Sequence, residues 1–307
     1  MSTVSPEGSV RTLPRSERRN SALTWVSDIN VLVKARLTLL VLITTLVGFL
    51  FACGPEVDGL LLFNTLFGTF LAAAGAAALN QVFEADYDGL MRRTRNRPIP
   101  AQRISRDHGF AIGLGCSAVG VVYLSLTTNF LTALLTAITI GTYVFAYTPL
   151  KRITTLNTIV GAVPGALPPV IGWAAVRGEV NFESWLLFAI LFLWQMPHFL
   201  AIAWLYRKDY RDAGFVMLSG NDTECRVTGR LALFYTVALV SISLLPYVLR
   251  LTSPWYVLIA FATGFGFFIA ALTLALTGTD KAARRLFLVS IVYLPITLGA
   301  LVITRTP

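Results

Sequence analysis

The sequence predicts an all-α protein that crosses a lipid bilayer nine times as one helical bundle, and its composition is the first reason. Hydrophobic residues make up 55% of the 307 residues, whereas only 13% are charged; an average soluble domain has about 25% charged residues. The mean hydropathy is +0.69. A soluble protein with so few charges would leave too much apolar surface in water. The composition therefore excludes an ordinary soluble enzyme and a disordered chain.

The length of the apolar segments is the second reason. A membrane-spanning helix needs about 20 mostly apolar residues, whereas the strands of an outer-membrane barrel alternate over about 10 residues. Nine stretches have the length of a spanning helix: residues 33–53, 59–80, 108–127, 129–148, 156–176, 184–205, 230–249, 254–277 and 285–304. Prolines inside them, such as Pro164, are compatible with membrane helices because neighbouring helices satisfy the freed backbone groups.

The distribution of positive charge predicts the orientation. All but three of the 25 Lys and Arg residues lie before or at the start of the first stretch, or in every second loop after it; the exceptions are Arg177, Arg250 and Arg305. Since basic residues collect in cytoplasmic loops, we expect the N-terminus in the cytoplasm and the C-terminus outside. The same rule accounts for the net charge of +9, and without a nucleic-acid motif we expect no nucleic-acid partner.

Two segments of the chain stand outside the apolar stretches. Residues 1–30 are polar and lack the apolar core of a secretory signal peptide. We interpret them as a cytoplasmic tail, and residues 31–307 as one membrane domain. Within that domain only two loops are long, at about residues 81–107 and 206–229, and both are predicted to be cytoplasmic. Both carry clustered acidic and basic residues.

The first cluster is acidic and lies at the end of the second predicted helix. Asn80, Glu84 and Asp88 are spaced four residues apart, which places them on one helical face. Acids near membrane depth are costly and usually functional, and a bound cation would relieve their mutual repulsion. Mg²⁺ prefers one or two carboxylates together with substrate phosphates. The cluster therefore predicts a Mg²⁺ site; the alternative is a solvated helix end with incidental acids.

Arginines follow the acids directly, in the segment that contains Arg92, Arg93 and Arg97. The guanidinium group binds phosphate through two parallel hydrogen bonds. A metal-binding face beside an arginine cluster is the arrangement that a diphosphate needs. Membrane topology alone also places arginines in cytoplasmic loops, but it does not explain why they adjoin the acids.

A second acidic cluster follows the sixth predicted helix. Asp209 and Asp212 stand there with the neighbouring basic residues Arg207 and Lys208. We expect Asp209 to hold a second metal ion or the same one, and the basic pair to contact substrate. A mixed-charge helix end without a function is the alternative.

Further polar residues occur at the ends of other helices or inside them. Tyr147, Lys151 and Arg152 end the fourth predicted helix. We expect Lys151 and Arg152 to cap a diphosphate, and Tyr147 to donate a hydrogen bond or face a cation; an interfacial tyrosine with topological charges is the alternative. His198 lies inside the sixth predicted helix, beside Pro197. Such a histidine is a candidate contact for a porphyrin, or it satisfies a backbone carbonyl.

Taken together, these motifs resemble those of the UbiA superfamily of intramembrane prenyltransferases, and within it the members that prenylate heme. The resemblance covers about residues 30–300, and its segments are Asn80–Pro100, Tyr147–Arg152, Asn157–Trp173, Trp194–Phe199 and Lys208–Leu218. It implies a UbiA-type bundle around a central cavity that opens to lipid. It also implies farnesyl diphosphate and heme b as substrates, heme O as product, Mg²⁺ as cofactor and a bacterial inner membrane as location.

The resemblance carries over to individual residues. Asn80, Glu84 and Asp88 match the first metal–diphosphate motif, and the basic stretch after it includes Arg92, Arg93 and Arg97. Tyr147 and Lys151 match a Tyr-x-x-x-Lys element, and Asp209 falls in the second acidic region. This chain has Glu84 where most bacterial relatives carry Asp, and its second region lacks the usual Asp-x-x-x-Asp form.

The resemblance also suggests partners, namely the bilayer and a heme A synthase or a terminal oxidase assembly. Two other functions stay open. One is a prenyltransferase that acts on a quinone precursor or a chlorin. The other is a secondary transporter, which would place its ion site near the membrane midplane, whereas both acidic clusters here stand at helix ends.

Overall fold

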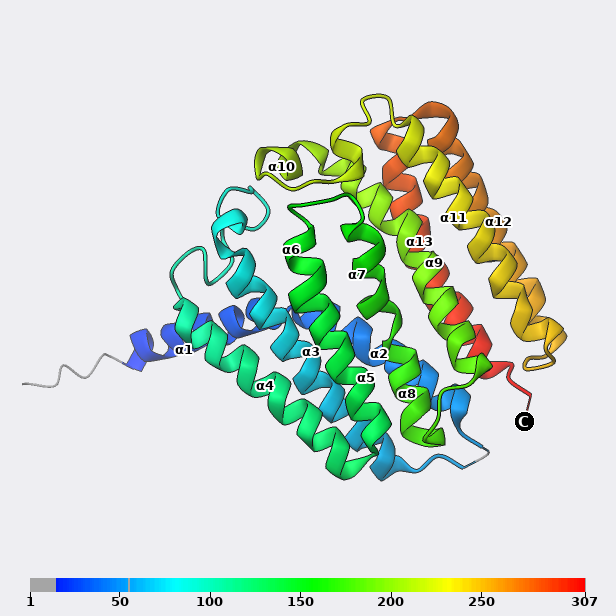
Figure 1. Cartoon of the computed structure of the whole chain (residues 1–307), viewed down its shortest axis with the longest axis horizontal. Helices are drawn as coiled ribbons and strands as arrows, with labels where there is room; N and C mark the ends of the chain where they lie inside the picture. Colours follow the sequence, from blue (N-terminus) through cyan, green and yellow to red (C-terminus); the bar gives the residue numbers. More distant parts are fainter. Residues whose placement is uncertain (1–14, 55, 307) are drawn as a thin grey trace, which may run out of the picture.

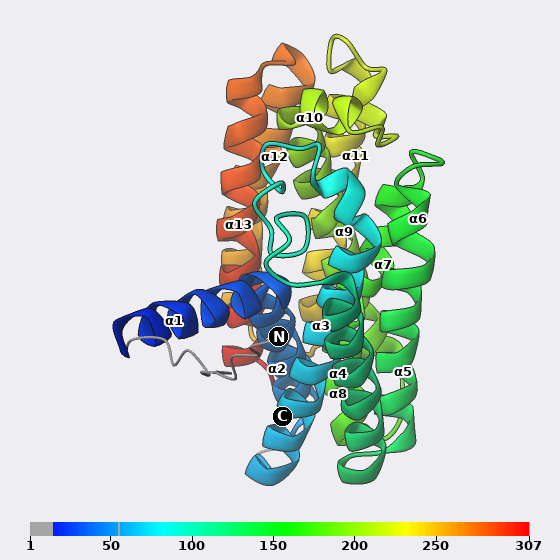
Figure 2. The same ribbon diagram turned by 90° about the vertical axis from the view of Figure 1, so that its left-hand side faces the viewer.

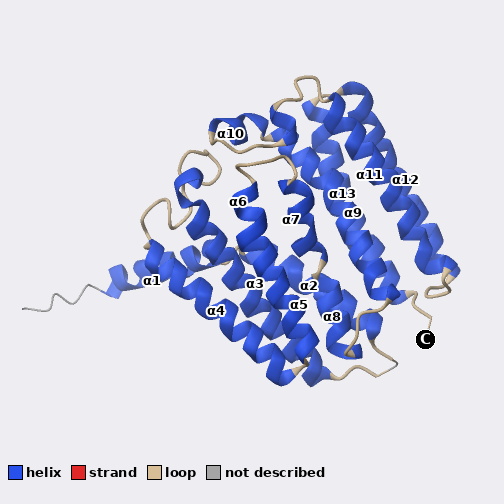
Figure 3. Cartoon of the chain, viewed as in Figure 1, coloured by secondary structure: helices blue, strands red, loops and turns tan. Residues whose placement is uncertain are grey.

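The computed structural model describes residues 15–54 and 56–306, and this part of the chain contains nine helical spans long and apolar enough to cross a membrane. They are α2 (Ala35–Ala52), α3 (Gly59–Asp88), α4 (Arg106–Thr127), the run α5 (Phe130–Gly141), η1 (Thr142–Tyr147) and α6 (Thr148–Leu150), the pair α7 (Asn157–Ala166) and α8 (Pro168–Arg177), α9 (Phe182–Leu205), α11 (Arg226–Val248), α12 (Pro254–Thr277) and α13 (Asp280–Ile303). The described chain consists of helices and loops (Figure 3). The predicted all-α membrane bundle is confirmed.

The spans form one bundle with α9 near its middle (Figure 1). Helices α11, α12 and α13 pack together on one side, and α3, α4 and α5 form the other. Helix α9 packs against α7, α11 and α13 and so joins the two sides. The two long loops lie at the same end of the bundle, near α6 and α10 (Arg207–Asp212). The fold therefore brings both charged segments of the sequence to one end.

Helix α3 is held by close packing against α4. Glycines on α4 allow the two backbones to approach, as small residues commonly do between membrane helices. A Cβ atom at Gly120 would lie 2.7 Å from the Ala72 nitrogen, and one at Gly113 would lie 2.8 Å from the Leu79 side chain. Any larger residue at either position would push the helices apart. This packing fixes the helix that carries the first acidic cluster.

Two spans are broken next to this helix. The span that begins with α5 widens into a π-helix at Thr142–Tyr147 before α6 completes it. Such π segments are rare in proteins, and those that occur are often found at functional sites. The following span breaks between Ala166 and Pro168, where a proline begins α8. These breaks change which side chains face the centre of the bundle.

The helix boundaries in the structure differ from the predicted ones at the end of α3 and at the start of α13, where charged residues lie. The second span was expected to end at residue 80, but α3 continues to Asp88. Helix α13 likewise begins five residues early, at Asp280, where the Thr279 side chain accepts a hydrogen bond from the Ala282 nitrogen. Hydropathy penalises charged residues, so it shortens a helix that ends in acids or bases.

The predicted polar tail is described only in part. Residues 1–14 lie outside the described residues, and helix α1 (Arg15–Leu32) follows them. This helix points away from the bundle (Figure 2) and exposes Trp25 and Val26. The division into a tail and a membrane domain at residue 30 stays a prediction.

Candidate active site

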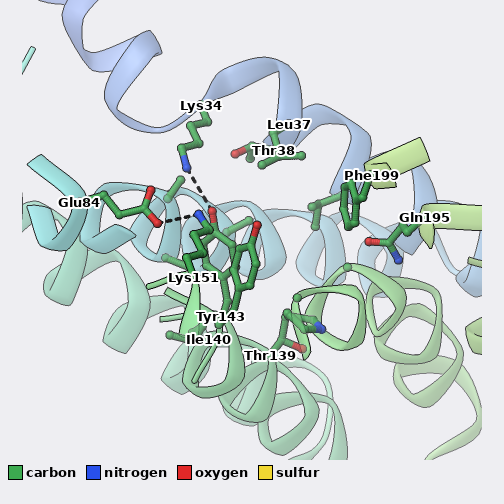
Figure 4. A pocket seen from close by; sticks show the side chains of 18 of the residues that line it. Lys34, Leu37, Thr38, Glu84, Thr139, Ile140, Tyr143, Lys151, Gln195 and Phe199 are labelled. Atoms are coloured by element: carbon green, nitrogen blue, oxygen red, sulfur yellow. Dashed lines mark hydrogen bonds and ion pairs between the residues drawn. The ribbon is translucent and has the colours of Figure 1, made fainter. Parts of the chain in front are cut away.

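A cavity of about 400 Å³ lies between α2, α3, η1, α7 and α9, within the range of about 300–1,000 Å³ typical of small-molecule sites. One end is charged, and its ionisable residues are Lys34, Glu84, Asp88, Arg93, Arg97 and Lys151. The rest of the wall is mainly apolar and includes Ala72, Ala76, Ile140, Ile171 and Phe199. Figure 4 shows Glu84 and Lys151 at one end of the view, and Gln195 and Phe199 at the other.

The three residues of the first acidic cluster share one buried face of α3. Asn80, Glu84 and Asp88 are 0%, 5% and 1% exposed. Glu84 Oε1 accepts a hydrogen bond from Lys151 Nζ at 2.6 Å. Asp88 Oδ2 accepts one from Arg97 Nη1 at 2.6 Å, whereas its Oδ1 is buried without a partner. A buried carboxylate oxygen without a partner is costly and is a natural contact for a cation.

The turn after α3 places Arg97 against Asp88. The Thr94 hydroxyl donates to the Asp88 carbonyl at 2.8 Å and so satisfies one of the free carbonyls at the helix end. The Arg97 backbone nitrogen then donates to the Thr94 carbonyl at 2.9 Å. The chain thereby turns back, and the predicted arginine segment meets the predicted acids.

Lys151 reaches the acids from the other side of the cavity. Its ammonium group lies 4.3 Å from the centre of the Tyr147 ring, which belongs to η1. Burial alone would lower the pKa of Lys151, but the Glu84 carboxylate and the neighbouring Tyr147 and Tyr143 groups together outweigh burial and raise this pKa above its usual value. Lys151 is therefore charged at neutral pH. The predicted Tyr147–Lys151 element and the predicted acids are thus brought together.

Lys34 is a residue of this site that sequence reasoning missed. It joins α1 to α2 with a left-handed backbone (φ 49°), a conformation that costs a non-glycine residue about 1–3 kcal/mol and clusters at functional sites. Its Nζ donates to Asn80 Oδ1 and, at 3.1 Å, to the Tyr143 hydroxyl. Burial, with a contribution from Arg97, lowers the pKa of Lys34 to about 7. In the sequence it appeared only as one of the topological charges.

Helix α10 contributes Tyr210 to the cavity wall rather than Asp209. The Arg93 guanidinium lies over the Tyr206 and Tyr210 rings, at 5.2 and 5.8 Å from their centres, and Nη2 donates to the Tyr210 hydroxyl at 3.3 Å. Asp209 is half-buried and does not line the cavity. Its side chain makes no hydrogen bond or ion pair within the described residues.

Other predicted residues stand at the margin of the site. Arg152 lies over the Tyr87 ring at 4.1 Å, and Arg207 pairs with Asp280 at 2.9 Å. Neither lines the cavity, and the same holds for Arg92, Lys208 and His198. Among the described residues, no group of three or more His, Cys, Asp or Glu side chains gathers to hold a metal ion. A site here must therefore draw ligands from elsewhere, as Mg²⁺ sites with substrate phosphates do.

Comparisons with known proteins identify the family of this chain. Residues 41–293 match the UbiA prenyltransferase family. A relative from Solibacter usitatus, named protoheme IX farnesyltransferase, is 42% identical over 283 residues, which cover 89% of this chain and 97% of the relative.

Solved structures share the fold. A digeranylgeranylglyceryl phosphate synthase superposes with a TM-score of 0.78 at 18% identity, covering 91% of this chain and 98% of that one. A UbiA homolog from Archaeoglobus fulgidus bound to GPP and Mg²⁺ gives a TM-score of 0.63 at 13% identity and covers 89% and 99%. The match over most of the chain and the identity to the relative show that this protein belongs to the UbiA prenyltransferase family.

Proposed function

We propose that this protein transfers a farnesyl group from farnesyl diphosphate to the 2-vinyl group of heme b, releasing diphosphate and forming heme O. The cavity carries the proposal, because it joins a charged end to a long apolar wall as a prenyl diphosphate requires. The name of the Solibacter relative supports farnesyl as donor group and heme as acceptor. Membership of a prenyltransferase family favours this function over a transporter.

The residues at the charged end fit Mg²⁺. Asp88 presents a buried oxygen without a partner, and Glu84 lies one turn before it on the same helix. We propose that these two carboxylates hold the ion, with diphosphate oxygens completing its coordination. When bound, the ion neutralises the charge that develops on the leaving diphosphate. Asn80 joins them once its amide oxygen is released from Lys34.

Asp209 keeps its proposed role as a further ligand from the opposite loop. Its carboxylate has no partner among the described residues, and its neighbour Tyr210 already lines the cavity. For this role α10 must move toward α3 when substrate binds. We propose that Arg92, Arg152, Arg207 and Lys208 stand at the rim and attract the diphosphate.

Four basic side chains at the charged end bind the diphosphate in this proposal: Lys34, Arg93, Arg97 and Lys151. Against the two carboxylates they leave a net charge of +2 among the described lining residues when Lys34 is protonated, and of +1 when it is neutral. A trianionic diphosphate is therefore attracted before any chemistry occurs. Fixed charges of this kind also stabilise the leaving group without reorganisation in the transition state.

The reaction breaks the bond between farnesyl C1 and its oxygen, and the electron pair leaves with the diphosphate. The π electrons of the heme vinyl group then form the new bond to C1, and water adds a hydroxyl group to the resulting cation and loses a proton. The apolar wall keeps other water away from the allylic cation. The Tyr143 and Tyr147 rings, stacked at 5.7 Å, instead hold the Lys34 and Lys151 ammonium groups over their faces, at 5.7 and 4.3 Å from the ring centres.

A mass spectrum tests the proposed reaction. The purified protein is incubated in detergent with heme b, farnesyl diphosphate and Mg²⁺. We expect a heme species heavier by C15H26O, a farnesyl plus a hydroxyl group, which disappears when EDTA removes the metal. A prenylated quinone precursor in place of that species would overturn the acceptor. The absence of product with every acceptor would contradict the enzymatic proposal.

For the cellular setting, we propose a bacterial inner membrane with the N-terminus in the cytoplasm and the C-terminus outside. The asymmetry of the basic residues supports this orientation. A reporter fused after Pro307 tests it, since cytoplasmic activity of the reporter would contradict it. We also propose that heme O passes to a heme A synthase or a terminal oxidase assembly, because so apolar a product is poorly soluble in water.

A further inference from the structure

His198 lies on the flank of the cavity wall formed by α9. Gln195, Phe199 and Ile202 line the cavity from this helix. Successive residues of an α-helix are about 100° apart, so His198 stands about 40° from Ile202 and about 60° from Gln195 around the axis. Its contacts place it on the side that faces α13, where it meets Phe287 and Ser290.

The hydrogen bonds around His198 determine which ring nitrogen carries the proton. Ser290 has one hydroxyl proton, and it donates this proton to the Phe287 carbonyl at 2.6 Å. Its oxygen must therefore accept the hydrogen bond that joins it to His198 Nδ1 at 2.7 Å. The proton of the neutral ring is on Nδ1, and Nε2 keeps its lone pair. Metal-binding histidines are oriented in this way by a partner on the other nitrogen.

The free nitrogen is accessible and the ring is held in place. Nε2 has no hydrogen bond within the described residues, and it is not one of the buried atoms without a partner. The ring stacks on Trp194, with centres 5.0 Å apart and planes at 23°, and it packs against Phe287 at 5.1 Å. Phe199, which lines the cavity, is a third aromatic neighbour at 5.8 Å. The result is a fixed imidazole with an open lone pair in apolar surroundings.

We propose that His198 Nε2 binds the iron of heme b as an axial ligand and holds the porphyrin beside the cavity, on the side of α9 that faces α13, with one edge toward the farnesyl group. This inference rests on the proposed heme acceptor and deepens it. Imidazole is a common axial ligand of heme iron, and the aromatic neighbours offer flat apolar surfaces to a macrocycle. Ser290 is then a positioning residue, because it acts only through His198.

Absorption spectroscopy tests the ligand directly, because the chain contains only two histidines. Ferric heme b is titrated into the full-length protein in detergent, and both the Soret band and the dissociation constant are measured. We expect His198→Ala to lose the spectrum of histidine-ligated heme and to bind heme at least ten-fold more weakly, and added imidazole to restore the spectrum. The matched control is His108→Ala, since His108 is exposed and its side chain hydrogen-bonds only Ser105 among the described residues. It should behave like the wild type.

Two more variants keep the test decisive. Ser290→Ala should weaken heme binding about ten-fold while the iron stays ligated by histidine. His198→Met keeps the volume of the side chain and offers a thioether, so the spectrum should shift even if His198→Ala folds poorly. An unchanged spectrum in the His198 variants would overturn the inference.

The mass spectrum of the product distinguishes failure of the His198 ligand assignment from failure of the proposed function. Farnesylated heme from a wild type whose heme spectrum does not depend on His198 would leave the function intact. A wild type that binds heme through His198 but forms no farnesylated heme would contradict the function alone.

Discussion

The two acidic clusters look alike in the sequence but differ in the structure. Glu84 and Asp88 on α3 are buried, each is paired with a cation, and one oxygen is without a partner. Asp212 on α10 is 73% exposed on its side chain and stands 3.9 Å from Arg211, and Asp209 is half-buried without a partner among the described residues. The two acids of the first cluster line the cavity, whereas neither acid of the second does. Burial therefore distinguishes clusters that spacing and composition do not.

The largest effect is expected from Asp88→Asn. This change keeps the shape of the side chain but removes the charge that holds the cation and pairs with Arg97. Turnover should fall about 1,000-fold, because the leaving diphosphate loses its electrostatic stabilisation. Product formation measured by mass spectrometry checks this, with the melting temperature as the control for folding. Turnover near the wild-type rate would remove the first cluster from the metal site.

Breaking the Lys151–Glu84 pair tests how much this buried ion pair contributes to the stability of the first cluster. Lys151→Met leaves the Glu84 carboxylate buried without its partner, which should cost about 3–5 kcal/mol of unfolding free energy and about 100-fold in activity. Adding Glu84→Gln should restore most of the stability but none of the activity. Thermal or denaturant unfolding of the two single variants and the double variant measures the coupling. Additive losses would mean that the pair at 2.6 Å has no energetic role.

The Asp209→Asn variant tests whether the second cluster contributes a ligand to the metal site proposed on α3. If α10 closes on the bound diphosphate, the change should lower activity about ten-fold and raise the Mg²⁺ concentration needed for half-maximal rate. It should leave stability unchanged, because the side chain makes no hydrogen bond or ion pair within the described residues. The Mg²⁺ dependence of the rate is the measurement. An unchanged Mg²⁺ dependence would confine the metal site to α3.

Asp212→Asn should have the smallest effect. The side chain is exposed and its nearest charge is a sequence neighbour, and such surface pairs contribute about 0–1 kcal/mol. We expect activity within two-fold of the wild type and a change in stability below about 0.5 kcal/mol. A loss comparable with that of Asp209→Asn would show that the second cluster acts as a unit.

Much of the fold could be predicted from the sequence, because membrane spans follow from apolar length alone. The stretch 254–277, for instance, coincides with α12. The end of α3 could not be predicted from hydropathy, because a hydropathy window stops at charged residues. The bundle buries those residues all the same. The acids on one face followed from helical periodicity. The structure pairs them with Arg97 and Lys151, which the sequence analysis expected only to bind the diphosphate.

The missed residues have physical reasons too. Lys34 enters the site through a left-handed link between two helices, and a sequence carries no clear signal for that conformation at a lysine. Tyr143 and Tyr210 depend on the π segment and on the fold of the second loop. These contacts are tertiary, so no local sequence pattern predicts them. His198 was noticed as an unusual residue, but its orientation toward Ser290 needed the packing of α13 on α9.

The effect of Mg²⁺ on the binding of farnesyl thiodiphosphate, an analogue that does not react, tests directly whether the acids of α3 hold the metal. The dissociation constant is determined with Mg²⁺ and with EDTA for the wild type, Asp88→Asn and Asp212→Asn. If the buried cluster on α3 holds the metal with the diphosphate, Mg²⁺ tightens binding in the wild type and in Asp212→Asn but not in Asp88→Asn. Mg²⁺-dependent binding that survives in Asp88→Asn and is lost in Asp212→Asn would contradict the claim.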